Sequence, residues 1–223
     1  MSFFTRKPGL STPTTTTPPT EPVLVPVVSN NVVWPTTLTP RTFTLTLVAD
    51  LRVTGSVFGG SEIVNDLEDD FWTVSMEVDS RSGDEGARLE ALVNWLQGGI
   101  NTAEFGHFAR PQPRGSVLNT SLSASAAKGA DSVFMATSAG QEIKIGDMFS
   151  VSGLLLQVAE TVTAVGGSTE VKIVNRLRRA LTSGSAVTFD NPKIKWRMGS
   201  ASAVSNTVGG TNSVSLEFVE DIS

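Results

Sequence analysis

Residues 72–79 read WTVSMEVD, and their strict alternation indicates the class of fold. Large apolar side chains stand at every second position: Trp72, Val74, Met76 and Val78. Residues 42–47, TFTLTL, repeat the pattern with threonine at the polar positions. Because neighbouring side chains of a strand point to opposite faces, both stretches predict strands with one apolar and one polar face. A sheet covered on one side therefore organises this part of the chain.

One helix is expected next to these strands. Gly59-Gly60 and Asn65-Asp66 predict turns between the two strands. Ser82 and Glu85 have the spacing of a capping box, which satisfies free backbone donors at a helix start. Gly98-Gly99 provide the matching stop signal. Between the two signals lies an apolar stripe at helical spacing, which predicts a helix packed on the sheet: Leu89, Leu92, Val93 and Leu96.

A connector and a second β module follow the helix. Residues 105–115, FGHFARPQPRG, predict a stiff extended connector because Pro111 and Pro113 both fix the backbone. Residues 121–198 then contain short apolar runs separated by glycine turns, a pattern typical of a small OB-like β-barrel. The expected strands of this module are Ser132–Ala136, Met148–Ser152, Leu154–Ala159, Val171–Ile173, Ala186–Phe189 and Ile194–Met198.

The two ends of the chain differ in character. Residues 1–40 hold eight of the eleven prolines and ten threonines, which predicts an extended Thr/Pro-rich arm without a core of its own. Either a disordered tail or an arm that becomes ordered on a neighbouring subunit fits this composition. Within the arm, Val23–Val28 and Val32–Trp34 could dock as edge strands on a partner. Residues 199–223 end in an alternating stretch, expected to rejoin the sheet of residues 41–120 in a β-sandwich domain.

Composition narrows the function classes. The absence of cysteine excludes disulfides, thiolate catalysis and cysteine-ligated metals. The net charge is −5, with about −6 on residues 41–120 and about +3 on residues 121–198, so the body is too acidic for tight nucleic-acid binding. No apolar run reaches the length of a membrane span, and the N-terminus lacks a secretory h-region. These features predict a soluble protein that is not exported by a signal peptide.

The sequence contains no catalytic or ligand-binding pattern, which predicts no enzyme and no cofactor or metal site. The one histidine, His107, lies between phenylalanines in FGHF, and no Gly-x-Ser-x-Gly elbow accompanies it. The acidic residues from Asp66 to Asp70 lack EF-hand spacing and predict a solvated turn. Walker and Rossmann glycine patterns are absent. The run RLRR at 176–179 fits a solvated strand end better than a binding site for phosphate, sugar or an acidic surface.

Several short motifs in a fixed order carry a resemblance to a known family. They are Asp69–Trp72, Ala87–Leu92, Leu96–Gly99, Arg110–Gly115, Ile145–Phe149, Asn175–Arg178 and Asp190–Lys193. This succession, from about residue 57 to 198, resembles the distal tail proteins of long-tailed bacteriophages. The Thr/Pro-rich arm lies outside it.

The resemblance implies a β-sandwich hub domain that forms a ring, typically a hexamer, at the distal tip of the virion tail. An OB-like domain would project outward, and the chain would be made in the bacterial host cytoplasm. The expected partners are other copies of the chain, the tail tube protein, and baseplate hub or tail fibre proteins. DNA would only pass through the lumen, and no membrane insertion is expected. Candidate interface or domain-connector residues are His107, Arg110, Pro111, Pro113, Arg114, Arg176, Arg178 and Arg179.

Two other functions stay open at this point. The basic module 121–198 could bind a carbohydrate or another receptor at the tail tip, although the chain has no tyrosine to help. Alternatively, the chain could be a tail tube or terminator subunit that stacks into long tubes. A tail-tip hydrolase has no constellation of residues to support it.

Overall fold

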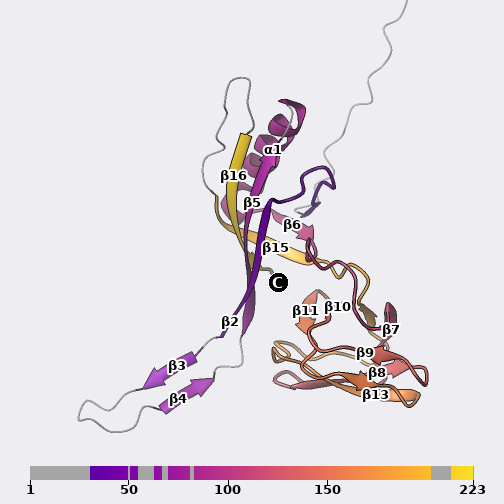
Figure 1. Cartoon of the computed structure of the whole chain (residues 1–223). Helices are drawn as coiled ribbons and strands as arrows, with labels where there is room; N and C mark the ends of the chain where they lie inside the picture. The colour runs from indigo at the N-terminus through magenta and orange to yellow at the C-terminus, as the bar shows by residue number, and fades with distance from the viewer. Residues whose placement is uncertain are drawn as a thin grey trace, which may run out of the picture.

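The computed structural model describes residues 31–49, 51–54, 63–66, 70–80, 83–201 and 212–222. In these residues the fold is mainly β with a single α-helix, which confirms the predicted class (Figure 1). The largest sheet has six strands in the order β1-β6-β15-β16-β5-β2. Its strands are β1 (Asn31–Val33), β2 (Thr42–Val48), β5 (Phe71–Ser80), β6 (Thr102–Phe105), β15 (Ile194–Ala201) and β16 (Asn212–Glu220).

The strands of this main sheet pair as the alternation predicts. β2 and β5 are antiparallel neighbours, with Leu45 opposite Val74. β16 lies between β15 and β5, so the C-terminal strand rejoins the first sheet as expected. Only β1 is parallel to its neighbour, β6.

One face of the main sheet forms the larger core. Helix α1 (Gly83–Leu96) lies alongside the sheet and buries Leu89, Leu92 and Leu96, which confirms the predicted stripe (Figure 1). Full burial of each leucine contributes about 1.5–3 kcal/mol. The helix ends in the turn η1 (Gln97–Gly99), where Gly98 and Gly99 have φ values of 63° and 98°. A Cβ at Gly99 would lie 2.6 Å from the Met198 carbonyl oxygen, so glycine permits close packing of this turn on β15.

The opposite face of the main sheet carries polar side chains. Thr42, Thr44 and Thr46 are exposed on β2, while Phe43, Leu45 and Leu47 are half-buried on the core side. Lys193, Lys195 and Arg197 are exposed, and Lys195 and Arg197 alternate along β15 with buried Ile194, Trp196 and Met198. The two-residue period that the sequence predicts is therefore realised on both faces.

The second module consists of several small sheets around its own core. One sheet has the order β11-β10-β14-β7, and the pairs β8–β13 and β9–β12 form two more. None of the sheets in the described residues closes into a barrel, so residues 121–198 form a β module but not the closed OB-like barrel that the glycine-separated strands predicted. The strands are β7 (Asn119–Ser121), β8 (Ser132–Thr137), β9 (Glu142–Ile143), β10 (Met148–Val151), β11 (Leu154–Gln157), β12 (Val162–Thr163), β13 (Gly167–Lys172) and β14 (Ala186–Thr188).

A tight hairpin joins two of these strands as predicted. Ser152 and Gly153 connect β10 to β11, and both have positive φ values, 47° and 79°. Positive φ at both central residues is the requirement of a type I′ turn, whose twist matches the flanking strands. This hairpin brings Leu154 and Leu155 back into buried positions.

The structure differs from the sequence-based expectations at three further places. Residues 31–40, predicted as part of the arm, belong to the core: β1 joins the main sheet, and Trp34 and Leu38 are buried. The prolines and threonines of residues 31–40 favoured an extended arm, and no sequence pattern indicated that Trp34 and Leu38 would be buried in the core. Asn65-Asp66 are not a turn but the end of strand β4 (Ile63–Asp66), paired with β3 (Leu51–Thr54). Finally, Ile194–Met198, assigned to the second module, lies in the main sheet because it pairs with β6 and β16.

Some predicted features fall outside the described residues. These are the turn at Gly59-Gly60, the helix cap Ser82, the acidic residues Glu68 and Asp69, and the first thirty residues of the arm.

Candidate assembly interface

The two modules meet at a buried carboxylate. Glu220, the last residue of β16, accepts hydrogen bonds from the backbone N–H groups of Trp72 at 3.2 Å and Leu155 at 3.3 Å. It also forms an ion pair with Arg178, and the two side chains are 0% and 2% exposed. Two further guanidinium nitrogens of Arg178, Nε and Nη1, have no partner among the described residues. The junction therefore depends on one pair of opposite charges that is removed from solvent.

Uncharged groups strengthen the same junction. The indole Nε1 of Trp72 donates to the Leu155 carbonyl at 2.9 Å, which ties β5 to the hairpin of the second module. Asn175 is fully buried beside it, donating from Nδ2 to Leu155 and accepting at Oδ1 from the Gln157 N–H. Met148 and Leu155 also belong to the core of the main sheet. The shared core and these hydrogen bonds fix how the two modules are oriented.

The connector docks onto the second module through Asp147. This residue is 4% exposed and lies in the turn before β10. Its carboxylate accepts from the backbone N–H groups of Arg114 and Gly115, both at 2.9 Å, and of Lys144 at 3.2 Å. The Arg114 side chain adds an ion pair at 3.7 Å and donates to the Ile145 carbonyl. The connector is thus held along one side and is not a free rod.

His107 lies where the connector leaves the main sheet. It is 9% exposed, and its ring is 4.9 Å from that of Phe43. Its Nδ1 accepts a hydrogen bond from the backbone N–H of Arg110 at 3.1 Å. Burial and, to a lesser extent, the positive charge of Arg110 lower the pKa of His107. A neutral ring packed on Phe43 fits the predicted packing role.

The remaining candidates occupy different settings. Pro111 is exposed, and its carbonyl accepts from the Asn191 N–H at 2.6 Å, while Pro113 is half-buried. Arg176 and Arg179 are half-buried, and Arg179 lies beside the Gly153 turn. Of the three arginines in the RLRR run, only Arg178 is buried. The preferred prediction of a solvated strand end is therefore wrong for Arg178, because Glu220 compensates its charge inside the junction.

Sequence reasoning missed the two acidic residues that organise the junction and the connector. Glu220 continues the two-residue period of Val214, Leu216 and Phe218, so its place on the buried face could have been found from the sequence. No periodic pattern around Asp147 predicts that it is buried. Its three backbone donors come together only when the connector and the turn are folded.

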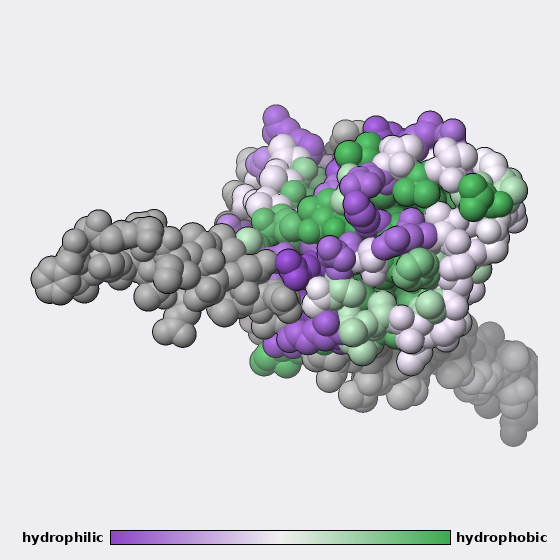
Figure 2. Space-filling model, turned by 90° about the horizontal axis from the view of Figure 1, so that it is seen from below, coloured by the Kyte–Doolittle hydropathy of each residue, from purple (hydrophilic) through white to green (hydrophobic). Residues whose placement is uncertain are grey.

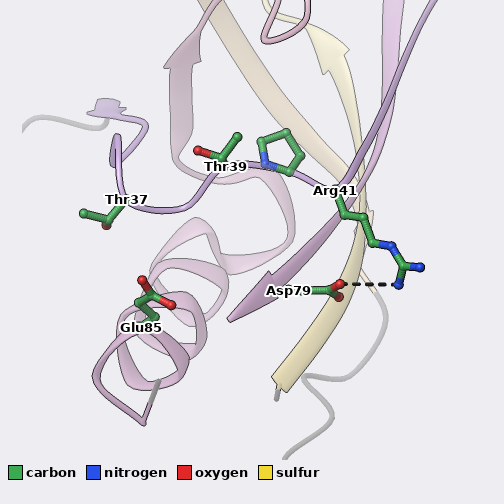
Figure 3. Close-up of a pocket in the computed structure, with 6 residues that line it drawn as sticks. Thr37, Thr39, Arg41, Asp79 and Glu85 are labelled. Carbon is green, nitrogen blue, oxygen red and sulfur yellow. Dashed lines mark ion pairs between the residues drawn. The ribbon is translucent and has the colours of Figure 1, made fainter. Parts of the chain in front are cut away.

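A polar pocket beside the start of α1 does not assemble reactive groups. A pocket of about 490 Å³ lies between the start of α1, the end of β5 and residues 37–41 (Figure 3). Arg41 and Asp79 form an ion pair across it at 3.5 Å, and Glu85 projects into it from the helix. No group of three or more His, Cys, Asp or Glu side chains in the described part of the chain is arranged to hold a metal ion. The pocket therefore gives no basis for assigning chemistry.

The outer surface is mixed in character. Seen from below, hydrophobic residues are interspersed with hydrophilic and intermediate ones (Figure 2). Exposed apolar residues of the second module include Ile145, Phe134 and Val165. Among the described elements, no helix is both long and apolar enough to cross a membrane.

Comparisons with protein-family models and with curated proteins give no match for this chain. Its function must therefore be inferred from the residues and the geometry described above.

Proposed function

We propose that this chain is a structural subunit of a bacteriophage tail tip. In this proposal, copies form a closed ring that joins the tail tube to the baseplate or receptor-binding apparatus and leaves a channel for DNA. The ring is formed by the main sheet, and the second module lies outside it. The order of motifs that resembles distal tail proteins supports the proposal, and so do three features of the fold.

The observation that carries the proposal is the hairpin of β3 and β4. Among the described strands these two pair only with each other, and the hairpin stands apart from both modules (Figure 1). An isolated two-stranded hairpin is at best marginally stable in water. Packing against another protein subunit would supply the missing stabilisation. Such an element is expected in a protein that functions in an assembly.

The part of the polar face formed by β2, β5 and β16 suits the wall of a DNA channel, whereas β15 on the same face carries the exposed side chains of Lys195 and Arg197. The strands β2, β5 and β16 contain no lysine or arginine, and their exposed face carries threonine, serine and carboxylate groups such as Glu217. Phosphate groups find no counter-charge on such a surface, so DNA would pass without being held. The fixed junction at Glu220 adds the rigidity that a ring subunit needs.

A tail tube subunit is the second candidate, favoured by the same hairpin. A hairpin that reaches away from the body could contact the ring above or below it and so build a tube. A receptor-binding module has less support, because Phe134 is the only aromatic side chain exposed in the described residues of the second module.

The test is the state of association of the purified chain. Light scattering and negative-stain microscopy at high concentration should give closed rings of about six copies with a central hole. Long tubes would favour the second candidate. A strict monomer, both alone and mixed with a tail tube protein, would contradict the proposal.

A further inference from the structure

The two edges of the main sheet differ in how they are protected. β1 is an edge strand of three residues, the short kind that resists pairing with other chains. β2, at the other edge, has seven residues with the sequence TFTLTLV. It contains no charge, proline or glycine, which are the usual devices that block an edge. Among the described residues β2 pairs only with β5, so its other edge offers a template for one more strand.

The core side of the sheet also continues past this edge. Phe43, Leu45 and Leu47 of β2 are only half-buried, whereas their neighbours on β5 are almost fully buried. Val74, opposite Leu45, is 1% exposed. A further strand with apolar side chains would complete the coverage of the three β2 residues.

We infer that this strand is Val23–Val28 of a second copy of the chain. The segment reads VLVPVV, and its six residues match the length of β2. Pro26 is compatible because the added strand would itself be an edge strand, where proline is tolerated. The inference rests on the proposed ring and names the contact between its neighbouring subunits.

The reach of the chain excludes pairing with the same copy. Two residues separate Val28 from Asn31, so Val28 lies within about 11 Å of the start of β1 even when fully extended. β2 lies five strands away from β1 across the sheet, which is about 24 Å at normal strand spacing. The segment therefore cannot lie along β2 of its own sheet.

A ring brings the required edges together. In a head-to-tail ring each contact joins two different surfaces of neighbouring copies. When the main sheets lie side by side, the β1 edge of one copy faces the β2 edge of the next. The segment that precedes β1 then begins beside the neighbour's open edge.

Cysteine crosslinking tests this contact directly, because the chain has no cysteine of its own. One sample carries Val25→Cys, and a second carries Thr44→Cys on the exposed side of β2. The two are mixed in the full-length chain, allowed to associate, oxidised and analysed on non-reducing gels. The control replaces the second sample with Ser125→Cys, an exposed serine of the second module.

The expected result is a mixed disulfide dimer of Val25→Cys with Thr44→Cys. At about 10 μM protein, a local concentration near 1 mM should make it form on the order of a hundredfold faster than the control dimer. Equal rates for the two pairs, in protein that forms rings, would overturn the inference and leave the ring proposal standing. Rings that persist after deletion of residues 1–30 would also overturn the inference and leave the ring proposal standing. Monomers without a mixed dimer would contradict both proposals.

Discussion

The junction between the modules and the β2 edge of the main sheet differ in how completely their side chains are buried and paired. At the junction, Glu220 has three partners, and the surrounding carbonyl and amide groups of Leu155 are paired. At the edge, β2 ends the sheet with half-buried apolar side chains and no blocking charge. In the proposed ring, the junction would fix the shape of each copy and the β2 edge would provide the surface for association. Substitutions at the junction should affect folding, and those at the edge should affect assembly.

Glu220→Ala should have the largest effect on folding. The substitution leaves the guanidinium of Arg178 buried without its counter-charge, which typically costs about 3–5 kcal/mol. The free energy of unfolding is measured by urea denaturation of the full chain. Glu170→Ala, at an exposed position on β13, is the matched control.

The reciprocal change at the junction sharpens this prediction. Arg178→Met should cost less than Glu220→Ala, because Glu220 keeps the N–H donors of Trp72 and Leu155. An equal loss in both variants would indicate that the ion pair, and not the leftover charge, determines the effect. A loss no larger than that of the Glu170 control would contradict the assigned junction.

Asp147→Ala should have the next largest effect. Three backbone N–H groups lose their acceptor, and hydrogen bonds to a charged group contribute about 1.5–3 kcal/mol. Because the connector docks through this residue, proteolysis between residues 110 and 115 should also accelerate. Cleavage at the wild-type rate would show that the connector is held by other contacts.

The pH dependence of stability should report on His107. Its pKa is lowered in the folded chain, so the unfolded chain binds the proton more readily. The contribution of His107 to stability is therefore fully present above about pH 6.5, the pKa of histidine in the unfolded chain. This contribution is lost as the pH falls from about 6.5 toward the lower pKa of the folded chain. The unfolding free energy is compared at pH 7.5 and pH 5.5. His107→Gln, which replaces the only histidine, should reduce this difference, and an unchanged difference would assign it to carboxylates.

Alternation and helical spacing sufficed to predict much of the fold. The sequence predicted β2, β5 and α1 because each has one apolar face, and the burial of that face stabilises the element. The return of β16 to the main sheet was also predicted. Strand partners were harder, since Ile194–Met198 has the same pattern whether it pairs in the main sheet or in the second module.

The junction was less predictable from the sequence. Buried charges are rare, so an Arg-rich run is normally assigned to solvent, and Arg178 breaks that rule only because Glu220 lies opposite it. The two residues are 42 positions apart in the sequence, and no local pattern links them. Pairing of this kind is set by the tertiary fold.

Thr44→Lys should have the smallest effect on folding and still prevent association. Thr44 is exposed, and surface substitutions of this kind usually change stability by about 0.5 kcal/mol or less. A lysine in the centre of β2 adds the charge that natural edge strands use to resist pairing. Light scattering should therefore show smaller species, while the urea midpoint stays close to that of the unmodified chain. Ser125→Lys should leave both measurements unchanged. Should Thr44→Lys assemble as well as this control, the open edge would not be the contact between copies, and the contrast with the junction would no longer explain how the chain assembles.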